Sequence, residues 1–167
     1  MSFSYIWKRK EANFGSPIEE QVEGGTHITC EVILKKDGKY LAVRRSSIPG
    51  HESPPKAKKF PKGCLYFVHN LFIYGESVGD YLNRVIKEQI GVGVKSYKII
   101  ALDSNLQEKD NNWSFCPYVL VEVDKLPVPG NYGNDVVEVV TFTKENVPED
   151  FGWWEKEELK EFLEKYD

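Results

Sequence analysis

The chain has 167 residues, of which 41% are hydrophobic and 13% aromatic, a composition that favours one globular domain and excludes a largely disordered protein. Its net charge of -4 argues against non-specific nucleic-acid binding, and no apolar stretch approaches the roughly 20 residues of a membrane span. The three cysteines form no C-x-x-C pair and the N-terminus shows no secretory pattern, so we expect a cytoplasmic protein without disulfides.

The first part of the chain predicts an extension followed by a hairpin. Residues 1–25 lack periodicity, so we assign them to an N-terminal extension and residues 26–167 to one domain. Residues 27–34 alternate polar and β-branched side chains, as a strand does, and residues 40–45 continue as its partner. The Asp-Gly dipeptide between them, Asp37-Gly38, is a strong hairpin-turn signal.

The middle of the chain predicts a loop, strands and a helix. Residues 47–63 are rich in Pro, Gly and Lys, and residues 64–74 are apolar and aromatic enough for one or two strands. A helix is expected over residues 78–90, with Ser77 as its N-cap and Gly91 as its C-terminal stop. Helical spacing predicts that this helix exposes Asp80 and buries an apolar stripe formed by Leu82, Val85, Ile86 and Ile90.

The last part of the chain adds strands and a final helix. Strands are expected over residues 94–102, 113–123 and 136–143, with a turn at 109–112. Residues 155–166 predict an acidic amphipathic helix. Because strands outnumber helices, the pattern predicts an α/β fold in which two helices cover a mixed sheet.

Residues 70–92 resemble the Nudix box, the signature of the Nudix hydrolase superfamily. That pattern is G, five residues, E, seven residues, then R-E-U-x-E-E-x-G-U, where U is a bulky aliphatic residue. The register needs no gap, and the matching residues are Glu76, Arg84, Ile86, Glu88, Gly91 and Val92. The resemblance covers roughly residues 27–165 and implies an α/β/α sandwich with a central mixed β-sheet.

Three positions of the box depart from the pattern. Asn70 replaces the first Gly, Val85 replaces the Glu after Arg84, and Gln89 replaces the second Glu of the pair. The P-G-G that usually precedes the box is also replaced, by residues 68–70. The box is therefore degenerate at the positions that carry its chemistry.

The resemblance implies hydrolysis of a nucleoside diphosphate linked to another group, such as a nucleotide sugar, with Mg²⁺ or Mn²⁺ as cofactor. Positions 85, 88 and 89 would hold the metal, but only Glu88, the implied catalytic residue, is a carboxylate, and Gln89 offers a neutral oxygen. We therefore expect weak metal binding without a ligand, because Mg²⁺ requires several oxygen ligands. Glu76 and Arg84 are implied to form a structural ion pair. Asp80, Arg84 and Glu88 equally fit an ion-paired helix face.

Candidate substrate-binding residues are Arg44 and Arg45, where a strand ends near the family's phosphate site, and Trp113, which could stack on a base or belong to the core. Spacing selects none of the later carboxylates Glu122, Asp135 and Glu138 as a further metal ligand. Two functions stay open: a divergent hydrolase, or an inactive Nudix-fold module that binds a nucleotide-like ligand or a protein. In either case we expect a small nucleotide derivative as partner, no nucleic acid and no membrane, and we leave a homodimer open.

Overall fold

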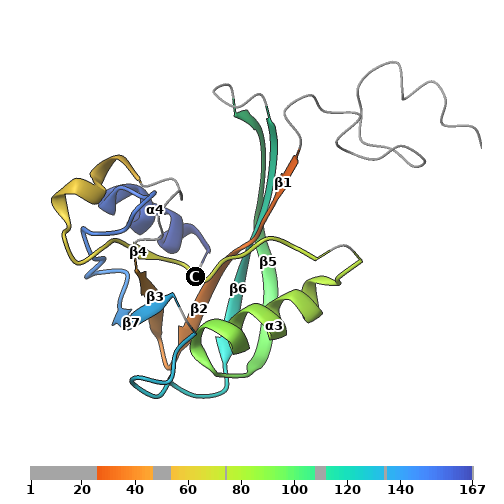
Figure 1. Ribbon diagram of the computed structural model, residues 1–167, viewed down its shortest axis with the longest axis horizontal. Helices are drawn as coiled ribbons and strands as arrows, with labels where there is room; N and C mark the ends of the chain where they lie inside the picture. The colour runs from red at the N-terminus through yellow and green to blue at the C-terminus, as the bar shows by residue number, and fades with distance from the viewer. Residues whose placement is uncertain (1–25, 47–53, 74, 108–111, 134, 167) are drawn as a thin grey trace, which may run out of the picture.

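The computed structural model describes residues 26–46, 54–73, 75–107, 112–133 and 135–166 (Figure 1). The extension predicted for residues 1–25 and most of the turn predicted at 109–112 lie outside these residues. No helix among the described residues is long and apolar enough to cross a membrane.

The predicted first strand is two strands, β1 (Thr26–Ile28) and β2 (Glu31–Lys36). Both pair in parallel with β6 (Asn112–Val123), one after the other along the same edge. The hairpin from β2 to β3 (Lys39–Arg45) is confirmed, and its turn residues Asp37 and Gly38 both have the positive φ that such a turn requires.

After β3 the described chain contains the short 3-10 helix η1 (Pro55–Lys59) and the two-residue strand β4 (Leu65–Tyr66). The strand prediction for residues 64–74 is therefore correct only at its start, and beyond it single bridges tie Val68 to Val32 and Leu71 to Thr29. This segment crosses the sheet instead of joining it as a full strand.

The helix α3 (Val78–Ile90) has the ends that the sequence predicted. Ser77 Oγ accepts a hydrogen bond from the backbone nitrogen of Asp80 at 3.1 Å, which satisfies an otherwise unpaired donor of the first turn. Gly91 ends the helix in the left-handed conformation with φ 69°.

The remaining elements are β5 (Val94–Gln107), β7 (Val136–Phe142) and α4 (Lys156–Tyr166). β5 continues beyond its predicted end at residue 102 because it stays paired with β6 along its whole length. The two strands rise past the helices as a ribbon (Figure 1).

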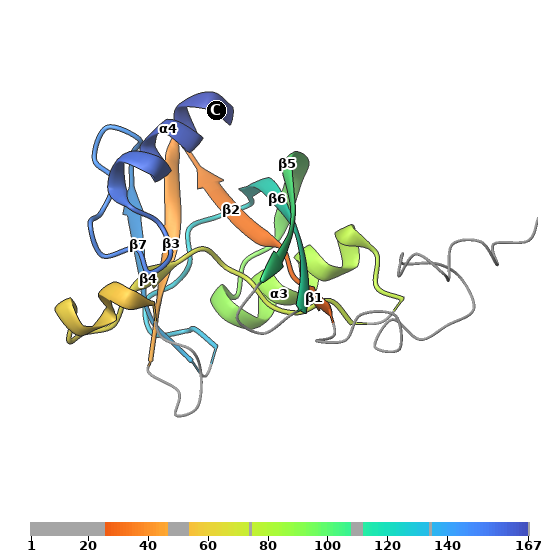
Figure 2. The ribbon, with the colours of Figure 1, turned by 90° about the horizontal axis from the view of Figure 1, so that it is seen from above.

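The sheet separates two apolar clusters, and the alternation of side chains along β2 shows how. Val32 and Leu34 belong to the cluster that α3 covers, whereas Ile33 lies in the cluster that α4 covers. Figure 2 shows the two helices on opposite sides of the sheet. The predicted layered α/β fold with a mixed sheet is confirmed.

The sheet divides at β3, and this division positions the candidate site. β3 pairs with β2 over Lys39 to Leu41 and with β4 through Val43 and Arg44, while β7 lies along its other edge. β3 thus leaves β2 before it ends at Arg45, close to where the chain after β4 crosses toward α3.

Candidate functional site

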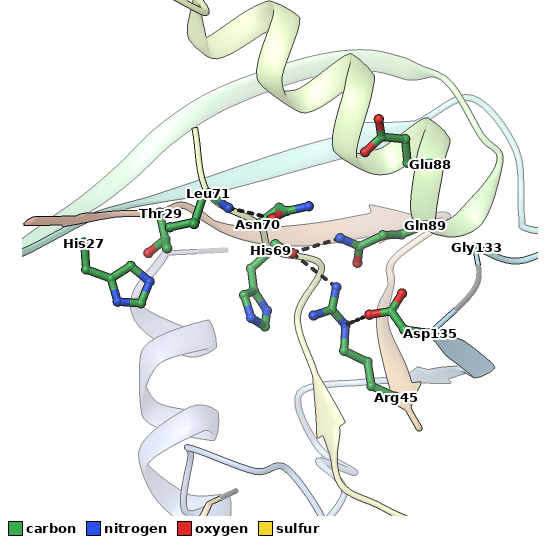
Figure 3. Close-up of a pocket in the computed structure, with 10 residues that line it drawn as sticks. All are labelled: His27, Thr29, Arg45, His69, Asn70, Leu71, Glu88, Gln89, Gly133 and Asp135. Atoms are coloured by element: carbon green, nitrogen blue, oxygen red, sulfur yellow. Dashed lines mark hydrogen bonds and ion pairs between the residues drawn. The ribbon is translucent and has the colours of Figure 1, made fainter. Parts of the chain in front are cut away.

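A pocket of about 730 Å³ lies between the end of β3, the C-terminal half of α3 and the chain after β4 (Figure 3). Its lining consists of His27, Thr29, Arg45, His69, Asn70, Leu71, Glu88, Gln89, Gly133 and Asp135. The loop before β7 closes one side, since Gly133 N donates a hydrogen bond to Gln89 O at 2.9 Å. A side chain at Gly133 would place its Cβ only 2.3 Å from Glu88 O, so this approach requires glycine.

Positions 85, 88 and 89, where the resemblance implies metal ligands, have different environments in this chain. Val85 is fully buried in the cluster beneath α3, together with Leu82 and Ile86, and Asp80 is exposed. The predicted burial pattern of the helix is therefore confirmed. Val85 contributes to the core and not to the pocket.

Gln89 lines the pocket but is only 5% exposed. Its Nε2 donates a hydrogen bond to His69 O at 2.8 Å, which fixes the orientation of the amide. Among the described residues, Oε1 has no hydrogen-bond partner. The amide thus ties the end of α3 to the crossing segment, a bond that a carboxylate in this position could not donate.

Arg45 brings a positive charge into the middle of the pocket (Figure 3). Its Nη2 donates to His69 O at 3.3 Å, and its Nε lies 3.2 Å from Asp135 Oδ2 as an ion pair, although among the described residues this buried Nε has no hydrogen-bond partner. The Asp135 carboxylate therefore attracts the guanidinium by its charge. Burial lowers the pKa of His69, and the nearby Arg45 lowers it further, so the imidazole is neutral near pH 7.

Glu88 is the most accessible carboxylate of the helix at this pocket. Its side chain is 56% exposed, and Oε2 lies 3.4 Å from Nη1 of Arg84. This contact is long and solvated, so it leaves Glu88 free to meet a ligand.

The Glu76–Arg84 ion pair is confirmed. Arg84 Nε and Nη2 donate to the two carboxylate oxygens of Glu76 at 2.6 Å and 2.8 Å, and Nη2 also donates to Leu71 O at 3.1 Å. The hydrogen bonds from Arg84 hold the pKa of Glu76 below its usual value, and the same pairing raises the pKa of Arg84. The pair fastens the loop before α3 to the helix.

Two of the predicted substrate-binding residues lie away from the pocket lining. Arg44 points to the other side of β3, where it contacts Glu138 at 2.7 Å and Asp150 at 2.6 Å. Trp113 lies on the β5–β6 ribbon and donates from Nε1 to Ser104 Oγ at 2.8 Å. Among the predicted substrate-binding residues Arg44, Arg45 and Trp113, the pocket lining includes Arg45.

Sequence reasoning did not identify His27 or His69 as pocket residues. For His69 a signal was present, because it stands in the segment that replaces the usual P-G-G before the box. His27 offered none, since an exposed strand histidine looks the same whether or not a pocket lies beside it. Asp135 was one of several later carboxylates, and only the position of Arg45 distinguishes it.

The pocket residues do not fit a divalent metal ion held by the protein alone. The described residues contain no group of three or more His, Cys, Asp or Glu side chains that could hold a metal ion. Asp135 is engaged by Arg45, the amide of Gln89 adds no charge, and a guanidinium stands in the same pocket. Glu88 alone supplies too little charge for an ion that gives up its water reluctantly.

Known sequences and known structures differ in what they show for this chain. No protein-family model matches the sequence, and no curated protein sequence matches it. The fold, by contrast, matches solved Nudix hydrolases.

An ADP-ribose pyrophosphatase from Streptococcus suis has 17% identity and a TM-score of 0.58, covering 83% of this chain and 90% of that chain. A MutT Nudix hydrolase from Burkholderia pseudomallei has 16% identity and a TM-score of 0.55, covering 75% of this chain and 89% of that chain. A UDP-X diphosphatase has 13% identity and a TM-score of 0.59, covering 99% of this chain and 71% of that chain. The chain therefore has the Nudix fold, as its degenerate box implied.

Proposed function

We propose that this chain is a divergent Nudix-type protein that binds a nucleoside diphosphate linked to another group, in the pocket beside the C-terminal half of α3. The position of Arg45 carries the proposal. A guanidinium held in place by a carboxylate and a carbonyl presents its remaining donors in a fixed fork, which suits phosphate oxygens. We expect any Mg²⁺ or Mn²⁺ to bind together with the ligand phosphates and not to the ligand-free protein.

The pocket is large enough for such a ligand. Its volume of about 730 Å³ lies within the roughly 300–1,000 Å³ of small-molecule sites. Two neighbours of the same fold are named for ADP-ribose and for UDP-X, which supports this class of ligand. Two carboxylates line the pocket, and each lies near an arginine: Asp135 near Arg45, and the exposed Glu88 near Arg84. The positive charge of each arginine reduces the repulsion between that carboxylate and a phosphate held at Arg45.

The second candidate function is slow hydrolysis of the same ligand class. One observation favours it: Glu88, the box carboxylate that remains, is exposed at the pocket and not consumed by a strong ion pair. Against it stands Val85, whose burial removes one of the three box positions from the site. We therefore place binding first and turnover second.

Calorimetric titration with ADP-ribose and UDP-glucose, each with and without Mn²⁺, tests the proposal. We expect the wild type to bind at least one of them, and Arg45→Met to weaken that binding by about tenfold or more, because a charged phosphate contact is lost. Arg45→Lys keeps the charge without the fork and should fall between the two. Thermal melts check that each variant is folded.

Lys98→Met on β5 is the matched control, since Lys98 is exposed and lies outside the pocket lining. Equal affinity in wild type and Arg45→Met, or no binding of either nucleotide by the wild type, would contradict the proposal. Formation of AMP from ADP-ribose, or of UMP from UDP-glucose, measured on the same samples decides between binding and hydrolysis. Product formation above background that requires Mn²⁺ would place the second candidate first.

A further inference from the structure

The pocket has two ends of different chemistry (Figure 3). One end holds the charged and strongly polar side chains, which are Arg45, Glu88, Gln89 and Asp135. The other end is formed by an imidazole, a hydroxyl and an aliphatic side chain, those of His27, Thr29 and Leu71. A ligand with one charged and one flat, weakly polar part fits such a pocket in a single direction.

The backbone fixes the second end. Thr29 and Leu71 form an antiparallel bridge, and Phe72 N donates a hydrogen bond to Ile28 O at 3.2 Å. These contacts hold the end of β1 against the segment that crosses from His69 toward α3. His27 and Leu71 thus come from distant parts of the chain but line one end of the same pocket (Figure 3).

Both side chains at this end are accessible. His27 is exposed and lines the pocket. Leu71 is 54% exposed, which leaves an aliphatic surface in water although its backbone is fixed by Thr29 and Arg84. An imidazole face and an aliphatic side chain are both surfaces on which a nucleobase packs.

We infer that the base of the bound nucleotide lies at this end, against His27 and Leu71, while its phosphates lie at Arg45. The inference rests on the proposed function, and it adds the direction in which the ligand binds and the residues that recognise the nucleoside. It also moves base recognition from Trp113, the stacking candidate in the sequence, to His27. Since this end is formed by an imidazole, a hydroxyl and an aliphatic side chain, its expected contribution to binding does not require a metal ion.

The test compares a ligand with a base and a ligand without one. ADP and inorganic pyrophosphate are titrated calorimetrically into the wild type, His27→Ala, Leu71→Ser and Trp113→Leu. We expect the wild type to bind ADP more tightly than pyrophosphate. His27→Ala should weaken ADP about tenfold, as the loss of a stacking side chain does, and Leu71→Ser by a smaller factor, with pyrophosphate unchanged in both.

Leu126→Ser is the matched control for Leu71→Ser, since Leu126 is 50% exposed and lies outside the pocket lining. Equal affinities of the wild type for ADP and pyrophosphate would overturn the inference and leave the proposed function standing. So would a loss of ADP binding in Trp113→Leu with none in His27→Ala. Failure of the wild type to bind ADP would overturn the inference, whereas the proposed function is decided by the titrations with ADP-ribose and UDP-glucose. Because His27 and Leu71 are exposed, folding of these variants is expected to be unaffected.

Discussion

The start of α3 and its C-terminal half both lie in the segment that resembles the Nudix box, yet they match its pattern to different degrees. At the start, Ser77 caps the helix and Glu76 pairs with Arg84 through two short hydrogen bonds. In the C-terminal half, Val85 is buried in the core and Gln89 bonds to a backbone carbonyl. The comparison teaches that the structural and the chemical roles of one motif are physically separable.

The difference follows from the free energy lost when a charged side chain is left without its partner. Removing one member of the Glu76–Arg84 pair leaves a mostly buried charge unpaired, so the pair is retained or lost as a unit. Neighbouring carboxylates at a metal site repel one another when no cation is bound. An apolar residue at 85 and an amide at 89 create no such repulsion, and in this chain they add packing and a hydrogen bond.

The largest expected effect comes from restoring the family residues, with Val85→Glu combined with Gln89→Glu. A carboxylate at position 85 would enter a fully buried apolar cluster, and one at 89 would face the carbonyl of His69 without a proton to donate. We expect a loss of about 3–5 kcal/mol in the free energy of unfolding, measured by urea denaturation. Added Mg²⁺ should not restore it.

Asn83→Glu is the control for this experiment, because it adds a carboxylate to an exposed position of the same helix. It should change the stability by no more than a few tenths of a kcal/mol. A folded double variant whose melting temperature rises with Mg²⁺ would show that the metal site is intact, by mass action, and that the two halves of the helix have not diverged.

A smaller effect is expected from breaking the retained pair, with Glu76→Gln. The Glu76 side chain is 8% exposed, so the variant leaves Arg84 with weaker partners and should lower the free energy of unfolding by about 2 kcal/mol. Changing both residues, with Arg84→Met added, should cost less than the sum of the two single changes. An additive result would mean that the two side chains act independently.

The Glu76–Arg84 pair also predicts the direction in which the free energy of unfolding changes with pH. Because Arg84 holds the pKa of Glu76 below its unfolded value of about 4.3, the pair stabilises the fold above that pH. The contribution is lost as the pH falls through the lowered pKa of the folded state. The difference in stability between the wild type and Glu76→Gln should therefore be full near neutral pH and shrink in acid, in urea titrations at fixed ionic strength.

The sequence predicted the parts of the molecule that local rules govern. The bounds of α3 followed from Ser77, Gly91 and the apolar stripe, and the hairpin followed from Asp37-Gly38. The break of the first strand at Thr29 and Cys30 was missed because its residues keep alternating, and β1 and β2 pair with the same strand, β6, in one continuous register. Nothing local in the sequence marks such an interruption of the pairing.

The site residues named from the sequence come from the box-like segment and, at Arg45, from the end of a strand. Glu88, Gln89 and the Glu76–Arg84 pair followed from the register of the motif. Arg44 and Arg45 are adjacent in the strand, and their opposite directions decide which one enters the pocket, but their surroundings could not be known without the sheet. His27 lies at the pocket because β1 pairs with β6 and the adjoining Thr29 bridges to Leu71, which the sequence does not reveal.

The smallest effect on stability, and the sharpest test of the comparison, is expected from Glu88→Gln. Glu88 is exposed, and its i,i+4 contact with Arg84 is 3.4 Å long, so the variant should change the free energy of unfolding by less than about 0.5 kcal/mol. It removes the box carboxylate that remains at the pocket. If the wild type hydrolyses ADP-ribose to AMP in the presence of Mn²⁺, this variant should not, whereas Glu157→Gln, an exposed change on α4, should behave as the wild type. If the wild type only binds, Glu88→Gln should bind ADP-ribose as well as the wild type or slightly better, because a negative charge near the phosphates is removed.

A loss of stability in Glu88→Gln as large as that in Glu76→Gln would refute the contrast between the start of α3 and its C-terminal half. It would show that Glu88, like Glu76, stabilises the fold.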